Sequence, residues 1–163
     1  MRYAAVALLL VLTNSCTRPG KRDARAHVAP KAQVLIVTEE SKFKEAIVSR
    51  VTWRLDSADR SYHVAELEAL RHAQPENHVS IVILDEIWAW RSSRDVRKFL
   101  KRISPGQREK IILVSTADME SWRADQAGID AMTAASTEAN RDKVEEFIME
   151  RVNLLFLAER LSS

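Results

Sequence analysis

Glycine and cysteine are scarce in this chain of 163 residues, which contains three glycines and one cysteine. A single cysteine excludes an internal disulfide framework. So few glycines leave few places where the backbone could approach a phosphate group closely. Charge of one sign is lacking too, since 25 basic and 23 acidic residues give a formal net charge of +2. That balance argues against a nucleic-acid partner, which usually meets a concentrated basic face.

Long apolar runs are also missing. The longest, residues 4–12, is too short to span a bilayer as a helix, but it has the length of a signal-peptide core. The composition of the whole chain, 46% hydrophobic and 29% charged, is typical of a soluble globular protein. The chain is long enough for one domain with its own core and an extension.

Cys16 stands where a secretory cleavage site would fall, directly after the small residue Ser15. This pattern resembles the signal of bacterial lipoproteins, in which the cysteine is acylated and becomes the first mature residue; Thr13 departs from the leucine usual there. The resemblance implies a signal peptide over 1–15 and a lipid anchor on a membrane of the cell envelope. Because Thr17 and not aspartate follows the cysteine, it implies the outer membrane facing the periplasm in a Gram-negative cell. The alternative is a secreted protein whose cysteine is accidental.

Residues 16–32 show no apolar period and contain two prolines and a glycine. They predict a lipidated N-terminus followed by a flexible tether. The tether is basic, so it either contacts anionic lipid headgroups or is a solvated linker, and we favour the linker. Its basic residues are Arg18, Lys21, Arg22, Arg25 and Lys31.

From residue 33 onward, strand and helix signals alternate. Three continuous apolar runs predict strands buried on both faces, and two weaker segments complete a set of five: 34–37, 61–64, 79–84, 110–114 and 129–132. Helical spacing of apolar residues and capping residues predict helices at 41–55, at 65–73, from Ser92 or Ser93 to a break at Pro105, at 121–126, and from Ser136 or Thr137 onward.

This alternation predicts an α/β domain over 33–163, a three-layer α/β/α, doubly wound sheet of five parallel strands with the flavodoxin-like order 2-1-3-4-5. In such sheets the binding crevice lies at the carboxyl ends of the strands. We therefore expect any site among residues 38–41, 85–91 and 115–118.

The segment LDEIWAWRSSRDVRKFL (84–100) resembles the flavodoxin family, in which a strand runs into a Gly-x-Pro-x-Trp loop and then a helix ending in Phe-Leu. The resemblance continues through KIILVSTADM (110–119) and GIDAMTAAS (128–136). It implies a site for FMN at the carboxyl ends of the strands. The residues that remain of such a site are Thr38, Ser41, Trp88, Trp90 and Thr116.

Two loops depart from the family. The loop after the first strand has no glycine and carries Glu39 and Glu40 where a phosphate dianion would sit; like charges about 4 Å apart repel by about 1 kcal/mol even in water. The next loop carries Asp85 and Glu86 in place of glycine and a small residue. We therefore expect that FMN binding has been lost and that no cofactor is bound. The two tryptophans either stack on a flat ligand or pack the loop against a helix, and we favour packing.

Receiver domains share this fold and give a weaker resemblance. Glu39, Glu40 and Asp85 take places comparable to their acidic residues and phosphoacceptor, with Ser115 or Thr116 as the following hydroxyl. The receiver lysine is missing, and an exported domain is separated from cytoplasmic phosphodonors. We rank this alternative below a flavodoxin relative.

Metal binding and nucleophilic catalysis have little support. Five carboxylates could converge and bind Mg²⁺ or Ca²⁺: Glu39, Glu40, Asp85, Glu86 and Asp118. Because no EF-hand-like spacing exists, we favour a solvated acidic rim. The four histidines lack zinc spacing. No Gly-x-Ser-x-Gly elbow occurs, and the lone cysteine is assigned to the anchor. The sequence thus predicts a non-catalytic binding or assembly module of the cell envelope with an envelope protein as partner; the alternative is an exported FMN-binding electron-transfer protein.

Overall fold

The computed structural model describes residues 33–88, 91–117 and 129–162. The signal peptide, Cys16, the tether, Trp90, Asp118 and the helix expected at 121–126 lie outside the described residues. Within those residues, no helix has both the length and the apolarity that a membrane span requires.

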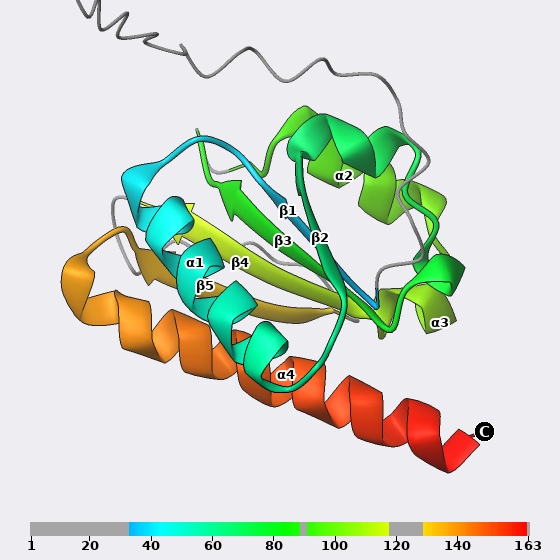
Figure 1. Ribbon diagram of the computed structural model, residues 1–163. Helices are drawn as coiled ribbons and strands as arrows, with labels where there is room; N and C mark the ends of the chain where they lie inside the picture. The colour runs from blue at the N-terminus through cyan, green and yellow to red at the C-terminus, as the bar shows by residue number, and fades with distance from the viewer. Residues whose placement is uncertain (1–32, 89–90, 118–128, 163) are drawn as a thin grey trace, which may run out of the picture.

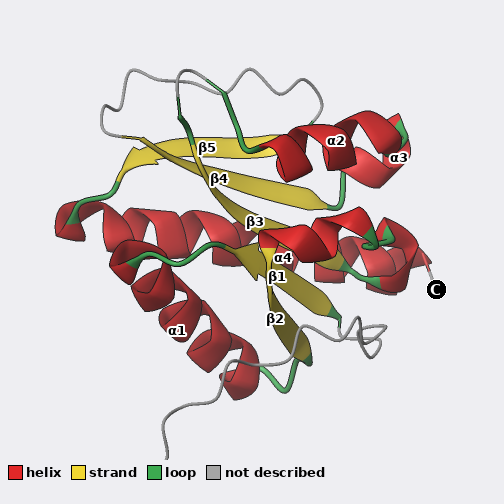
Figure 2. Cartoon of the chain, turned by 90° about the horizontal axis from the view of Figure 1, so that it is seen from above, coloured by secondary structure: helices red, strands yellow, loops and turns green. Residues whose placement is uncertain are grey.

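The described residues form one sheet of five parallel strands in the order β2-β1-β3-β4-β5, which confirms the expected topology (Figure 1). The strands fan out with the usual twist (Figure 2). Their bounds are β1 (Val34–Thr38), β2 (Tyr62–Glu66), β3 (Ser80–Glu86), β4 (Ile111–Ala117) and β5 (Asp130–Ala135). The three continuous apolar runs form β1, β3 and β4, the central strands, which are covered on both faces.

Helices cover both faces of the sheet. The longer ones, α1 (Lys42–Ser57) and α4 (Arg141–Ser162), lie side by side on one face, while α2 (Arg94–Arg102) and the 3₁₀ helix η1 (Leu67–Arg71) cover the other (Figure 1). The remaining short elements are η2 (Pro75–Asn77), α3 (Pro105–Arg108) and η3 (Glu138–Asn140). This is the predicted three-layer arrangement.

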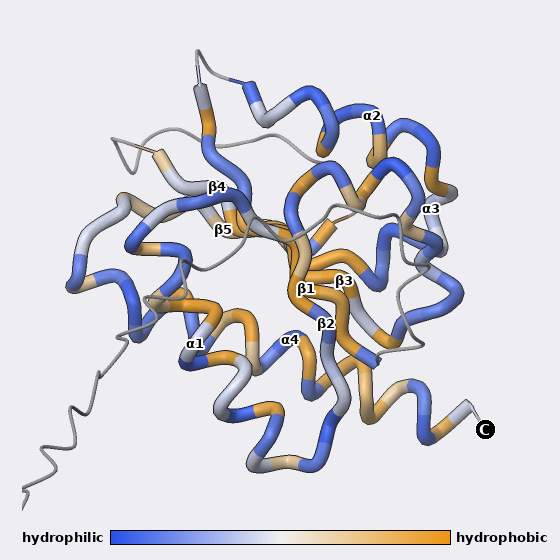
Figure 3. The backbone as a smooth tube through the Cα atoms, turned by 45° about the horizontal axis from the view of Figure 1, so that its top comes forward, coloured by the Kyte–Doolittle hydropathy of each residue, from blue (hydrophilic) through white to orange (hydrophobic). Residues whose placement is uncertain are grey.

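Alternation along the strands divides the core in two, and the apolar strands run through the centre of the molecule (Figure 3). Val34, Ile36, Val82 and Ile112 pack with α1 and α4. Leu35, Val37, Ile83 and Leu113 pack with α2 and η1. Because each fully buried aliphatic side chain contributes about 1.5–3 kcal/mol, the strands are held from both sides.

The prediction of an α-helix at 65–73 is wrong for its first two residues, which belong to β2, and for the type of helix, which is 3₁₀. Strand β2 continues to Glu66, which pairs with Thr38, because hydrogen bonding to β1 outweighs the helix propensity of the sequence. The rest forms η1, in which Leu67 and Leu70 are both buried. A spacing of three residues suits the tighter 3₁₀ turn.

Two other boundaries differ from prediction. Pro105 begins the short helix α3 instead of only ending α2, because Ser104 and Gln107 form a capping box: the Ser104 Oγ accepts from the Gln107 N–H at 3.3 Å, and the Gln107 Oε1 accepts from the Ser104 N–H at 2.7 Å. Thr137 opens η3, and the final helix α4 begins later, at Arg141.

Candidate functional site

A hollow of about 370 Å³ lies at the carboxyl ends of β1 and β2, beside the start of α2. Five of its nine lining residues are carboxylates, and Arg94 is the only cationic one among them. The lining residues are Thr38, Glu39, Glu40, Glu66, Leu67, Glu68, Ser93, Arg94 and Asp95. The hollow, called the acidic crevice below, lies at the edge of the sheet where the sequence predicted a site.

A buried lysine stands next to this crevice. Lys44, in the first turn of α1, is only 1% exposed. Its ammonium group forms an ion pair with the Glu39 carboxylate and lies 3.8 Å from the Glu86 Oε2. Because both carboxylates remain partly exposed, they neutralise Lys44 without being fully desolvated themselves. The loop after β1 therefore supplies its own anion to the first turn of α1.

Asp85, at the end of β3, is completely buried. Its Oδ2 and Oδ1 accept from the Ser93 N–H at 3.0 and 3.3 Å. Burial raises the pKa of Asp85 above its ordinary value, and the hydrogen bonds from Ser93 oppose that shift. The Ser93 Oγ in turn accepts from the Val96 N–H at 3.3 Å, which caps α2. Asp85 thus ties β3 to the start of α2.

Two of the hydroxyl groups predicted for a cofactor site donate to backbone carbonyl groups. Thr38 Oγ1 donates to the Glu39 carbonyl at 3.2 Å, and Thr116 Oγ1, which is buried, donates to the Asp85 carbonyl at 3.2 Å. Ser41 precedes α1 as predicted, but its hydroxyl makes no capping hydrogen bond. Two of these three hydroxyls therefore hold the loops in place by bonding to the backbone.

Trp88 follows β3 and is 79% exposed. Its N–H and carbonyl group bond to the carbonyl and N–H of Arg91, both at 3.0 Å. Since the indole is exposed, the interpretation that it packs the loop against a helix is wrong for Trp88. Trp90, its predicted companion, lies outside the described residues.

No group of three or more acidic, histidine or cysteine side chains within the described ranges is placed to hold a metal ion. Of the carboxylates considered for a cation, Glu39 and Glu86 face Lys44, and Asp85 faces Ser93. These carboxylates are therefore engaged with groups of the chain itself. Asp118 lies outside the described residues.

Lys44 is the residue of this edge that we did not single out from the sequence. The sequence did contain a signal for its burial, which is the spacing of one helix face shared by Lys44, Ile47, Val51 and Leu55. All four are buried in α1. A lysine in register with three apolar residues predicts a buried cation, which in turn requires an anionic partner.

Comparison with known proteins defines the class of fold. No family model and no curated protein matches the chain. Among solved structures, rubredoxin oxygen:oxidoreductase from Desulfovibrio gigas matches with a TM-score of 0.54 and 11% identity over 76% of this chain and 36% of that one. Two-electron reduced flavodoxin from Megasphaera elsdenii matches with a TM-score of 0.52 and 11% identity over 74% of this chain and 98% of that one. The domain therefore has the flavodoxin-like fold; at such identity, the likeness shows the fold alone.

Proposed function

We propose that this protein is an exported, lipid-anchored binding or assembly module of the cell envelope whose flavodoxin-like domain does not hold FMN. The observation that carries the proposal is the ion pair between Glu39 and the buried Lys44 at the first turn of α1. A phosphate entering this loop would compete with Glu39 for Lys44. It would also approach Glu40 and would lack the glycine backbone that phosphate-binding loops use.

The charge of the acidic crevice supports the same proposal. Its five carboxylates outnumber its one arginine, so the local field opposes the approach of a phosphate dianion. The predicted lipid anchor at Cys16 would hold the domain at the envelope, where its partner would be another envelope protein.

An FMN-binding electron-transfer protein is the second candidate, and the exposed indole of Trp88 favours it. The side chain follows β3 at the carboxyl edge of the sheet and has its surface free for stacking. A flat aromatic ring could stack on it with offset geometry.

FMN titration separates the two candidates. We expect the purified full chain to be colourless in visible light and to show no saturable quenching of tryptophan fluorescence at micromolar FMN. A yellow protein or saturable quenching would establish the second candidate. The double variant Glu39→Gln, Glu40→Gln sharpens the test, because a gain of FMN binding in that variant would show that the loop carboxylates exclude the phosphate.

Labelling with radioactive palmitate tests the anchor. Because Cys16 is the only cysteine, the full chain should incorporate label in a bacterial host and Cys16→Ser should not. Ser15→Ala, which keeps a small residue before the cysteine, is the matched control and should remain labelled. An unlabelled full chain would contradict the lipoprotein assignment.

A further inference from the structure

The last turns of α4 are apolar on two opposite faces. Val152 and Phe156 are buried in the core between α4 and the sheet. On the outward side, Leu154, Leu157 and Leu161 are 49%, 55% and 81% exposed. Spacings of three and four residues place these leucines on one stripe of the helix. Three exposed leucines in one row form a surface that the described part of the domain does not cover.

Positive charge lies beside this stripe. Arg60, just before β2, stacks over the Phe156 ring at 4.2 Å and donates to the Asn153 Oδ1 at 2.6 Å. Burial lowers the pKa of Arg60, and the positive charge of Arg160 lowers it further. Glu159 is the acidic residue on the same turn. Asn153, the partner of Arg60, precedes Leu157 by one helical turn and Arg160 follows it by one turn, so both arginines lie along one side of the stripe.

The stripe lies at the end of the molecule where the chain enters the fold. Helix α4 starts at the carboxyl edge of the sheet and ends beyond the opposite edge (Figure 1). Val34 begins β1 at that same end, since its N–H donates to the Ser61 carbonyl at 3.1 Å, next to Arg60. The entry of the chain, the arginines and the leucines therefore share one end.

The sequence before β1 is long enough for this end of the domain to reach the membrane that would hold the acyl anchor at Cys16. The chain advances 17 residues from Cys16 to Gln33. A chain of that length spans at most about 60 Å, which is long enough for a bilayer holding the anchor to contact this end of the domain. Five basic residues and one acidic residue stand between these two positions in the sequence.

From these observations we infer that the stripe of Leu154, Leu157 and Leu161, with Arg60 and Arg160 beside it, docks on an anionic lipid bilayer. The leucines enter the boundary between headgroups and acyl chains, and the arginines contact lipid phosphates. The acidic crevice then faces away from the membrane. This inference rests on the proposed function only in that the acyl anchor would deliver the domain to the bilayer.

Vesicle flotation of residues 17–163 tests the inference. This chain keeps all five strands and both helical layers, and it lacks Cys16 and the apolar run of the signal peptide, so neither acylation nor that run contributes. We expect it to float with vesicles of phosphatidylglycerol mixed with phosphatidylcholine, and more weakly with phosphatidylcholine alone. The double variant Leu154→Gln, Leu161→Gln should reduce the partition coefficient at least about tenfold, because two leucines no longer bury apolar surface.

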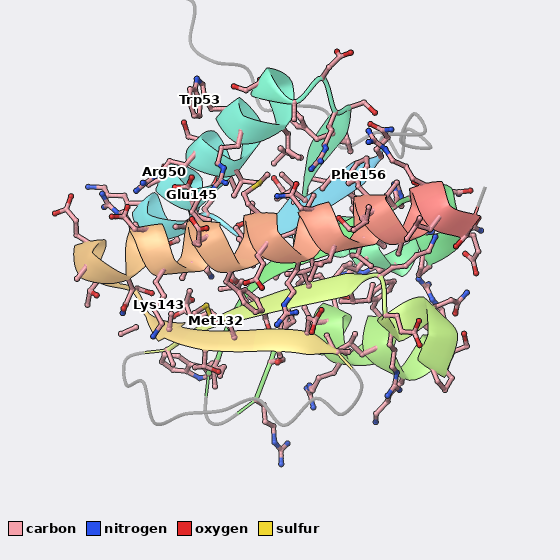
Figure 4. All side chains as sticks on the ribbon, turned by 90° about the horizontal axis from the view of Figure 1, so that it is seen from below. Arg50, Trp53, Met132, Lys143, Glu145 and Phe156 are labelled. Carbon is pink, nitrogen blue, oxygen red and sulfur yellow. The ribbon has the colours of Figure 1, made fainter. Side chains whose placement is uncertain are left out.

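Trp53 supplies the matched control. It is 70% exposed, and it points away from the body of the domain on α1 (Figure 4). Trp53→Gln should leave flotation unchanged, while Arg160→Gln should weaken binding only to the anionic vesicles. The leucine variant keeps every basic residue of the tether, so its loss of binding reports on the stripe alone.

Three outcomes would overturn the inference. They are failure of residues 17–163 to float with anionic vesicles, retention of binding by the leucine variant, and equal loss of binding in Trp53→Gln. Analytical sedimentation without lipid tests whether a second copy of the chain binds the stripe instead. A dimer that the leucine substitutions dissociate would assign the stripe to that second copy and would also overturn the inference. Since the assay uses a chain without Cys16, a failure of palmitate labelling in the full chain would refute the anchor and leave the vesicle result standing.

Discussion

The two ends of the sheet differ in whether their charged and apolar side chains have partners within the domain. At the carboxyl end, Lys44 is paired with Glu39, and Asp85 accepts two hydrogen bonds from Ser93. At the far end, Leu161 is almost fully exposed, and Arg160 follows Leu157 by one helical turn. Parallel sheets usually bind ligands at their carboxyl ends. In this domain the buried charges of that end are paired within the chain while its crevice stays acidic, and the exposed leucine stripe lies at the other end.

The buried ion pair gives the largest effect that we expect at the carboxyl end. Glu39→Ala removes the anion in contact with Lys44 and leaves Glu86 at 3.8 Å as the remaining partner of a buried ammonium group. We expect a loss of about 2–3 kcal/mol in the free energy of unfolding, measured by urea denaturation. Glu40→Ala is the control and should change stability little, because Glu40 is exposed. Equal effects at the two positions would mean that the ion pair does not stabilise this edge.

A smaller effect should distinguish the starts of the two helices at this edge. The Ser93 hydroxyl caps α2, whereas the Ser41 hydroxyl makes no capping bond to α1. Ser93→Ala should therefore cost about 1 kcal/mol and Ser41→Ala much less, as measured by thermal or urea unfolding. The prediction fails if the Ser41 substitution is the more costly one.

Asp85 adds an effect that depends on pH. Because burial raises its pKa in the folded protein, the folded state holds a proton at pH values where the unfolded state has released it. The contribution of Asp85 to stability therefore falls as pH rises from its ordinary pKa through its raised pKa. Asp85→Asn keeps an acceptor for Ser93 and cannot titrate. Urea unfolding at a series of pH values should show the variant gaining on the unchanged protein as pH rises, and the opposite slope would refute this account.

The far end should give the smallest change in stability. Leu154→Gln with Leu161→Gln should alter the free energy of unfolding by less than about 0.5 kcal/mol, because both side chains are exposed and glutamine favours helix. Val152→Ala, on the buried face of the same helix, should cost more than the two together. If the double variant is strongly destabilised, the stripe is part of the fold and not a free surface.

The central strands could be predicted from the sequence because burial on both faces leaves continuous apolar runs, as in β3 and β4. The edge strand β2 could not be bounded, since its one-sided pairing with β1 leaves only partial burial and a helix-favouring composition. Strand order followed from the alternation of elements. Local sequence therefore specified the centre of the sheet better than its margin.

The site was only partly predictable for a related reason. The acidic loop after β1 was visible in the sequence, but its charge is partly neutralised by Lys44. The second partner of Lys44 is Glu86, at the end of β3, which is far from Lys44 in the sequence. Likewise, the exposure of Trp88 did not follow from the tryptophans of the loop alone. The helical spacing of Lys44 indicates that this lysine is buried, but it does not identify Glu39 and Glu86 as its partners.

Helix α4 also determines when the domain can become complete during synthesis. It follows all five strands in chain order, yet its Val144, Ile148 and Val152 pack in the same core as Val82 and Val114 of the sheet. A nascent chain that has made β1 through β5 has α1 to cover part of that sheet face, but the part that α4 covers is still exposed. Chaperones that recognise exposed aliphatic surface can hold the chain in this state until residues 141–162 emerge and close it.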